Sequence, residues 1–134
     1  MKNLFASGAV LALAACAVQP APLGPPIVMS AAPGLTSAAI REAIVGQTGV
    51  GTMSGSNIVY SMYVAPDGTA LAKLPTGVDP GNWRLTEDGQ WCVAWKLFRG
   101  GEEYCQRVYH EGAGYKFVNS NSQELLTFAP GKGV

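Results

Sequence analysis

Apolar and polar residues alternate with a period of two along much of the second half of the chain. Three aromatic-rich runs lie between residues 81 and 109, separated by the turn-forming segments 87–90 and 99–101. Alternation predicts strands with one buried face, and short gaps that contain Gly predict hairpins. We therefore expect a three-stranded antiparallel meander at the centre of the fold.

Cys92 and Cys105 fall on consecutive strands of this meander. A disulfide between them requires both side chains on one face, and direct pairing requires a turn centred on Phe98–Arg99. Two buried, reduced thiols are the alternative. The disulfide register predicts a solvent-facing side with the cystine, Ala94, Lys96, Glu103 and Arg107. It predicts an inward side with Trp91, Val93, Trp95, Leu97, Tyr104, Gln106 and Val108.

Further elements flank the meander on both sides. The pattern predicts a helix from Thr36 or Ser37 to Val45, an irregular first strand within 47–55, and a loop over 75–81. It also predicts a hairpin of strands 58–64 and 69–74, and two last strands over 115–118 and 124–128. The expected fold is mainly β, an antiparallel meander or small barrel of about six to eight strands with one short N-terminal helix.

The inward positions of these strands are rich in aromatic residues. The expected core consists of Tyr60, Met62, Trp83, Leu85, Trp91, Val93, Trp95, Tyr104, Val108, Tyr115, Phe117, Leu126 and Phe128. Such rings either fill a small barrel or line a pocket at its mouth. The candidate cavity or rim residues are Tyr60, Trp83, Trp91, Trp95, Tyr104 and His110.

The first fifteen residues have the features of a secretory signal, with Lys2 before an apolar stretch too short to span a bilayer. Leu13-Ala14-Ala15-Cys16 resembles the lipobox of bacterial lipoprotein precursors. The resemblance implies cleavage before Cys16 and attachment of fatty-acyl chains such as palmitate there. An ordinary signal peptide with cleavage near Ala15 and a free cysteine is the alternative. Assigning Cys16 to the lipid leaves Cys92 and Cys105 as an even pair in an oxidising compartment.

Residues 16–35 are rich in Pro and Ala and lack an apolar period, which predicts a semi-rigid tether before a single β domain over 36–134. A tail without a spacing role is the alternative. By resemblance to enterobacterial lipoproteins, Ala17 after the lipidated cysteine favours the outer membrane, with the domain facing the periplasm.

The charge pattern argues against polyanionic partners. Loss of residues 1–15 removes Lys2 and leaves eight basic against nine acidic residues, a net charge of −1. No basic run interleaves with aromatic residues, so we expect no nucleic-acid partner and membrane contact through the lipid anchor alone.

Several motifs in the predicted domain resemble a proteobacterial family of small exported domains of unknown function, and also domains appended to some nucleotide cyclases. The resemblance covers about residues 40–118, implies the fold, and carries over no catalytic residue. Its motifs are Ile44-Val45-Gly46, Thr48, Gly51, Tyr63-Val64-Ala65-Pro66-Asp67-Gly68-Thr69, Gly81-Asn82-Trp83, Asp88-Gly89, Cys92, Cys105, Val108 and Tyr115.

The sequence favours a lipid-anchored binding or accessory module of the envelope, whose partner is an envelope protein or a small apolar ligand. A small periplasmic enzyme using Asp79, Asp88 or His110 is the alternative, although no nucleophile–base or acid–base spacing appears. A third possibility resembles the periplasmic inhibitors of lysozyme or proteases. We predict no catalytic residues, no cofactor and no metal site, because two cysteines and one histidine lack zinc-ligand spacing.

Overall fold

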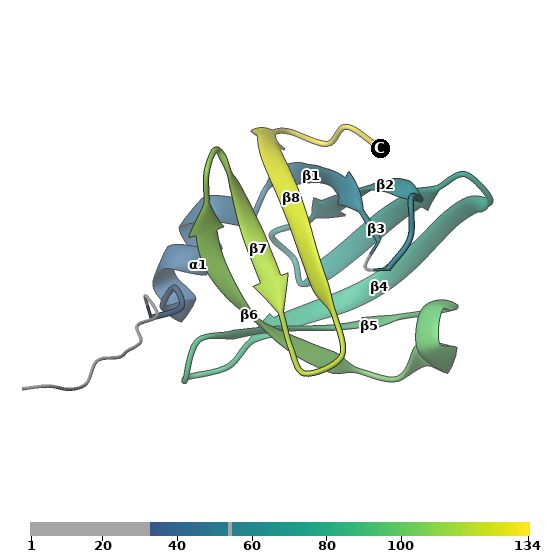
Figure 1. Ribbon diagram of the computed structural model, residues 1–134. Helices are drawn as coiled ribbons and strands as arrows, with labels where there is room; N and C mark the ends of the chain where they lie inside the picture. The colour runs from purple at the N-terminus through teal and green to yellow at the C-terminus, as the bar shows by residue number, and fades with distance from the viewer. Residues whose placement is uncertain (1–32, 54) are drawn as a thin grey trace, which may run out of the picture. The chain divides into compact units, whose positions relative to one another are not determined.

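The computed structural model of the protein describes residues 33–53 and 55–134 (Figure 1). The predicted signal peptide, Cys16 and most of the predicted tether lie outside the described residues. Pro33 to Val134 form one unit, and Leu35 already donates its N–H to the carbonyl of Val108 at 2.8 Å. Among the described residues, no helix has the length and apolar character needed to cross a membrane.

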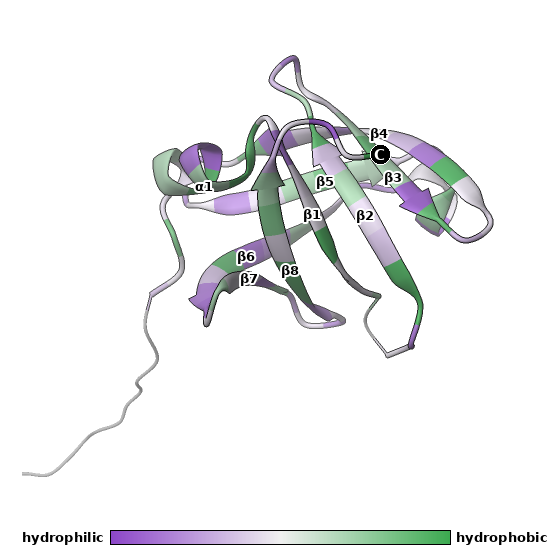
Figure 2. Ribbon diagram, turned by 90° about the horizontal axis from the view of Figure 1, so that it is seen from above, coloured by the Kyte–Doolittle hydropathy of each residue, from purple (hydrophilic) through white to green (hydrophobic). Residues whose placement is uncertain are grey.

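Eight antiparallel strands form a closed barrel in which each strand pairs with the next and the first pairs with the last. Hydropathy alternates along several of these strands (Figure 2), as expected for walls with one buried face. The predicted fold class is confirmed. The strands are β1 (Gln47–Thr52), β2 (Val59–Val64), β3 (Thr69–Leu74), β4 (Gly77–Leu85), β5 (Gln90–Trp95), β6 (Tyr104–Glu111), β7 (Gly114–Val118) and β8 (Gln123–Pro130).

One short helix, α1 (Ser37–Ile44), packs against the barrel. Thr36 caps it by accepting the N–H of Ala39 at 3.1 Å, as the sequence predicts. A helix of two turns is marginal alone, and α1 is held because Ile40 and Ile44 are fully buried in the barrel core.

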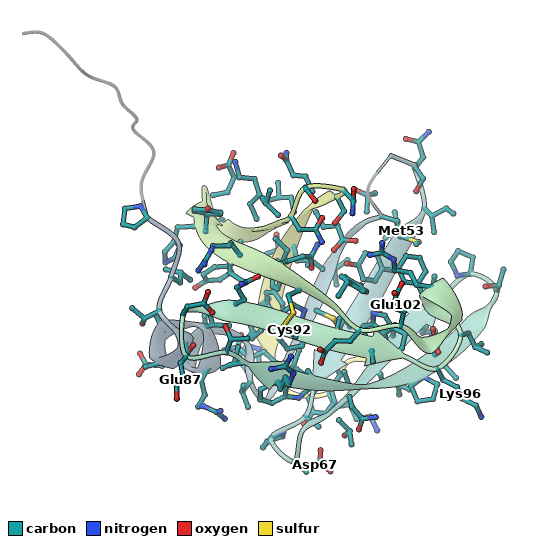
Figure 3. The ribbon with its side chains drawn as sticks, turned by 90° about the horizontal axis from the view of Figure 1, so that it is seen from below. Met53, Asp67, Glu87, Cys92, Lys96 and Glu102 are labelled. Carbon is teal, nitrogen blue, oxygen red and sulfur yellow. A yellow bond between two sulfur atoms is a disulfide. The ribbon has the colours of Figure 1, made fainter. Side chains whose placement is uncertain are left out.

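The two ends of the barrel differ. We call the end with α1 and turns 65–68, 86–89 and 112–113 the closed end, and the end with loops 53–58, 96–103 and 119–122 the open end. Figure 3 shows Glu87 beside the helix, and Met53 and Glu102 at the opposite end.

The central meander has the predicted register. Cys92 of β5 pairs with Cys105 of β6, and a disulfide joins them with their Cα atoms 4.0 Å apart. The connection contains the short 3₁₀ helix η1 (Phe98–Gly101), in which Arg99 and Gly100 have positive φ. This places the reversal at Phe98–Arg99, so both the disulfide and the position of the turn are confirmed.

Two predictions drawn from the alternation are wrong, one on the face of Leu97 and one on the solvent exposure of Cys92. Leu97 lies beyond the end of β5 and is 68% exposed, because the alternation of the strand stops at Trp95. Cys92, expected on a solvent-facing side, is fully buried. Arg84, which pairs with Cys92 across β4 and β5, forms an ion pair with Glu103 at 2.8 Å. The Glu103 carboxylate lies within 4.8 Å of both sulfurs, so this pair shields the disulfide.

The predicted loop over 75–81 is also wrong, because β4 begins at Gly77. Pro80 lies within the strand, where its carbonyl accepts the N–H of Lys96 at 2.8 Å. The N–H and C=O of a strand residue point to the same side, and on that side β5 has already ended at Trp95. The missing N–H of proline therefore breaks no pairing of the barrel.

All thirteen residues of the predicted core belong to the observed core or pack against it. Large rings are accommodated by glycines at the paired positions of the neighbouring strands, Gly49 beside Phe128 and Gly81 beside Trp95. A Cβ at Gly49 would lie 2.6 Å from the ring of Phe128, and one at Gly81 would lie 2.7 Å from the ring of Trp95. These glycines are therefore required by packing inside the barrel.

Replacing both Cys92 and Cys105 with Ala should lower the free energy of unfolding by about 3 kcal/mol, because the bond closes a loop of about fourteen residues. The residues are 13 positions apart. Urea unfolding monitored by tryptophan fluorescence measures the change. Equal stability of the variant and the parent, or ready alkylation of both thiols in the native parent, would contradict the bond.

Candidate functional site

A cavity of about 60 Å³ lies inside the barrel toward its open end. Every strand except β1 contributes to its wall, and its lining is mostly apolar and aromatic, as is typical of small-molecule sites. The lining residues are Met53, Tyr60, Met62, Ala72, Leu74, Asp79, Trp91, Val93, Trp95, Phe98, Tyr104, Gln106, Phe117, Glu124 and Leu126.

A second hollow of about 180 Å³ adjoins this cavity at the mouth of the barrel, and we call it the vestibule. The two share Met53, Phe98, Tyr104 and Glu124, while Arg99 lines only the vestibule. Met53 lies at this end of the molecule (Figure 3). The cavity is therefore reached through the loops of the open end.

Contacts between rings fix the aromatic walls. Trp91 lies edge-on to Phe117 with ring centroids 6.2 Å apart, and Phe98 lies edge-on to Tyr104 at 6.0 Å. The indole Nε1 of Trp95 donates to the Tyr104 hydroxyl at 3.1 Å. Edge-to-face pairs and a buried hydrogen bond hold these rings in place without a ligand, so the walls are preformed.

The carboxyl group of Glu124 lies among these rings. Its Oε1 accepts a long hydrogen bond of 3.4 Å from Nε2 of Gln106, and it accepts a second from the Tyr60 hydroxyl. Burial raises the pKa of Glu124, and these two hydrogen bonds only partly oppose that effect. Ionised Glu124 therefore lies in an environment that disfavours its charge.

The two tyrosines near Glu124 remain protonated at neutral pH. Burial, followed by the charge of Glu124, raises the pKa of Tyr60 far above its usual value. The same two effects, in that order, raise the pKa of Tyr104 to about 12. Both hydroxyls are therefore hydrogen-bonding groups and not bases at this site.

Asp79 is the second carboxylate in the cavity wall, and it is 4% exposed. Its two oxygens accept the backbone N–H groups of Leu97 and Phe98, both at 2.9 Å. Asp79 thereby fixes the start of the connection between β5 and β6. Its hydrogen bonds give it a structural role at the mouth.

Gln106 is the most buried polar residue of the cavity, with 1% exposure. Its Nε2 donates to Ser122 Oγ at 3.1 Å and to Glu124. Its Oε1 accepts no hydrogen bond from any residue that the structure describes. A buried carbonyl oxygen without a protein donor is uncommon, and this one belongs to a residue in the cavity wall.

The structure brings four of the six candidate cavity residues together: Tyr60, Trp91, Trp95 and Tyr104. Trp83 and His110 do not line the cavity. Trp83 lies at the closed end, where its Nε1 donates to the Ala65 carbonyl at 2.9 Å. His110 is exposed and packs on the ring of Tyr115 with centroids 4.6 Å apart.

Sequence reasoning did not single out Glu124 and Gln106 as site residues. The signal was present, because Gln106 was assigned to the inward face and Glu124 lies two residues before inward Leu126. An acidic residue on an inward position of a strand indicates either a buried charge or a site. The alternation of inward and outward positions along β8 was therefore sufficient to identify Glu124 as a candidate site residue.

The residues named for catalysis are not brought together. Asp79 lies near the start of β4 at the open end, whereas Asp88 lies in the turn after β4 at the closed end. Asp88 forms an exposed ion pair with Arg107 at 3.0 Å. These two carboxylates therefore belong to different ends of the barrel and do not form an acid–base pair.

One group of potential metal ligands occurs among the described residues, formed by Cys92, Glu103 and Cys105 within 4.8 Å of one another. Both sulfurs are in the disulfide, and the Glu103 carboxylate is paired with Arg84. No thiolate is present there to hold zinc.

Comparison of the chain with protein-family models, with curated proteins and with solved structures found no match.

Replacing Glu124 with Gln should stabilise the protein at pH 7 and have less effect at pH 4. The folded-state pKa of Glu124 lies above its unfolded value, so folding is favoured by the protonated form. That contribution is complete below the unfolded pKa and is lost as the pH rises through the folded pKa.

Thermal unfolding of parent and Glu124→Gln between pH 4 and pH 7 measures this difference. Glu102→Gln is the matched control, because Glu102 is exposed at the same end of the barrel. A gain in stability that is equal in the two variants, or that is largest at pH 4, would contradict the effect of burial at Glu124.

Proposed function

We propose that this protein is a lipid-anchored binding module of the cell envelope, and that its barrel takes a small, mainly apolar molecule into the cavity. The observation that carries the proposal is the preformed aromatic cavity whose wall contains Gln106, with an Oε1 that accepts no hydrogen bond from the described residues. Small barrels are usually filled by their own side chains. Here the space next to the tryptophans is left open.

The composition of the facing strands explains the open space. The inward position of β3 that lines the cavity carries Ala72, whose methyl group occupies little of the interior. Burying Glu124 and Gln106 beside apolar walls costs stability. Apolar residues would fill the same space more favourably, and this supports a binding role for the polar pair.

The entry of the chain into the barrel is compatible with a membrane anchor. Leu35 bonds to Val108, and its carbonyl lies next to the turn at Gly89, so the polypeptide joins the barrel near the closed end. The mouth lies at the other end. The first described residues of the chain therefore do not lie at the vestibule.

Exposed apolar side chains favour an envelope protein as a second partner. Val50, Val59 and Leu125 are each about half exposed, and they lie on the outer face of β1, β2 and β8, which are side by side (Figure 2). Adjacent apolar residues on a surface are typical of contact sites. This surface is separate from the cavity and would serve a docking role.

Addition of four-carbon probes should shift the indole ¹H–¹⁵N resonance of Trp95 more than that of Trp83, because Trp95 lines the cavity and Trp83 does not. The probes are 1-butanol, butylammonium and butyrate. Ala72→Leu, which fills the cavity, should weaken binding by at least about tenfold, equivalent to about 1.4 kcal/mol.

Ala94→Leu is the control for this variant, because Ala94 lies on the outer face of β5. It should leave probe affinity within about twofold, well under 1.4 kcal/mol. If none of the three probes gives a saturable shift at Trp95, the cavity does not bind small molecules and the proposed function is wrong.

Replacing Cys16 with Ser should remove the anchor, because the lipid is attached to the cysteine sulfur. The variant should appear as a soluble periplasmic protein or as an uncleaved precursor, as judged by fractionation and by the mass of the protein. Recovery of the variant in the outer membrane in the same proportion as the parent would contradict lipid anchoring.

A further inference from the structure

We propose that the ligand of this cavity is a small organic cation, whose ammonium group binds between the Glu124 carboxylate and Oε1 of Gln106 and is surrounded by aromatic rings. This inference rests on the proposed function and specifies the chemistry of its ligand. It follows from the charge of the cavity, its unpaired acceptor, its rings and its size.

The charge of the cavity has one sign. Of the described residues that line it, the two charged ones are Glu124 and Asp79, and both are carboxylates. Asp79 already accepts two backbone N–H groups. Glu124 accepts from Tyr60 and, at the long distance of 3.4 Å, from Gln106. A carboxylate has about four acceptor positions, so Glu124 retains capacity for a ligand donor.

Gln106 supplies an independent observation. Its side chain is buried, and Oε1 accepts no hydrogen bond from the described residues although Nε2 makes two. An acceptor beside a carboxylate is matched by a ligand group with several N–H donors. An ammonium group satisfies both oxygens, whereas an anionic group would repel Glu124 and satisfy neither.

The aromatic lining favours a positive charge as well. Tyr60, Trp91, Trp95 and Tyr104 contribute rings to the wall of one cavity. Ring faces attract ammonium groups, and clusters of such rings are the usual recognition site for alkylated ammonium ions. Desolvation inside the barrel strengthens this attraction relative to an exposed site.

The dimensions limit the cation. A cavity of about 60 Å³ holds an ammonium group with a short alkyl chain, and a longer ligand would extend into the vestibule. Arg99 lies at the vestibule, with its guanidinium 4.9 Å from the centroid of the Tyr104 ring. It does not line the cavity, so the positive charge of Arg99 stays outside the proposed site.

Titration with the three probes tests the inference. Butylammonium, 1-butanol and butyrate share an apolar chain and differ in the charge of the polar group. We expect butylammonium to bind at least about tenfold more tightly than 1-butanol, and butyrate to bind more weakly than both. The shift of the Trp95 indole resonance at each probe concentration gives the dissociation constants.

Glu124→Gln should weaken the binding of butylammonium by at least about tenfold and change the affinity for 1-butanol by less than about threefold. Glu102→Gln removes an exposed charge at the same end of the barrel, and it should leave the affinities for butylammonium and 1-butanol within about twofold of those of the parent. The inference that the ligand is a cation is wrong if all probes bind with equal affinity, if butyrate binds most tightly, or if both variants lose the same affinity for butylammonium. The proposed function would remain in each of these cases. If no probe binds at all, both the inference and the proposed function are wrong.

Discussion

The packing in both halves of the barrel interior depends on the ring of Trp91. Its ring stacks on Trp83 with centroids 5.6 Å apart and lies edge-on to Phe117, and it is 1% exposed. Trp83 is in turn held by the Ala65 carbonyl and covered by Arg41 of α1 at 5.5 Å. The closed half is therefore filled, whereas the other side of Trp91 forms the wall of the cavity. Trp91 therefore lies between the packed core of the closed end and the cavity of the open end.

The hollow half is kept open by features that do not depend on a ligand. The Asp79 carboxylate holds the backbone at Leu97 and Phe98, and the disulfide fixes the pairing of β5 with β6. Trp95 and Tyr104 are joined across this pair of strands by a hydrogen bond. Since a preorganised site loses less entropy on binding, a small ligand can be held by few contacts.

Much of the fold follows from the sequence because strand parity has a period of two and is constrained by the cystine. Pairing Cys92 with Cys105 correctly placed the inward residues of β5 and β6 and the turn at Phe98–Arg99. The same reasoning failed for Leu97, because parity holds only while the strand continues. It also failed at residues 77–81, where the position of Pro80 relative to the end of β5 decides whether a strand is possible. That relation is tertiary and cannot be obtained from local composition.

The site was less accessible to sequence reasoning for a related reason. Which inward residues line a cavity depends on barrel closure, because β8 pairs with β1 and so brings Glu124 toward Tyr60. The burial of Cys92 depends likewise on Arg84 and Glu103, which meet only when three strands are aligned. In both cases a charged residue that appears solvent-facing or incidental in the sequence acquires its role from a strand distant in the chain.

The buried carboxyl group of Glu124 lowers the stability of this barrel. An apolar residue there would extend the core formed by Leu126 and Phe117 and avoid the cost of a buried carboxyl. The carboxyl instead lies beside a glutamine whose oxygen has no donor among the described residues. One ligand group that donates to both oxygens would supply the hydrogen bonds that these two adjacent polar groups lack. The barrel thus retains a local instability at its mouth, and binding of a cation would remove it.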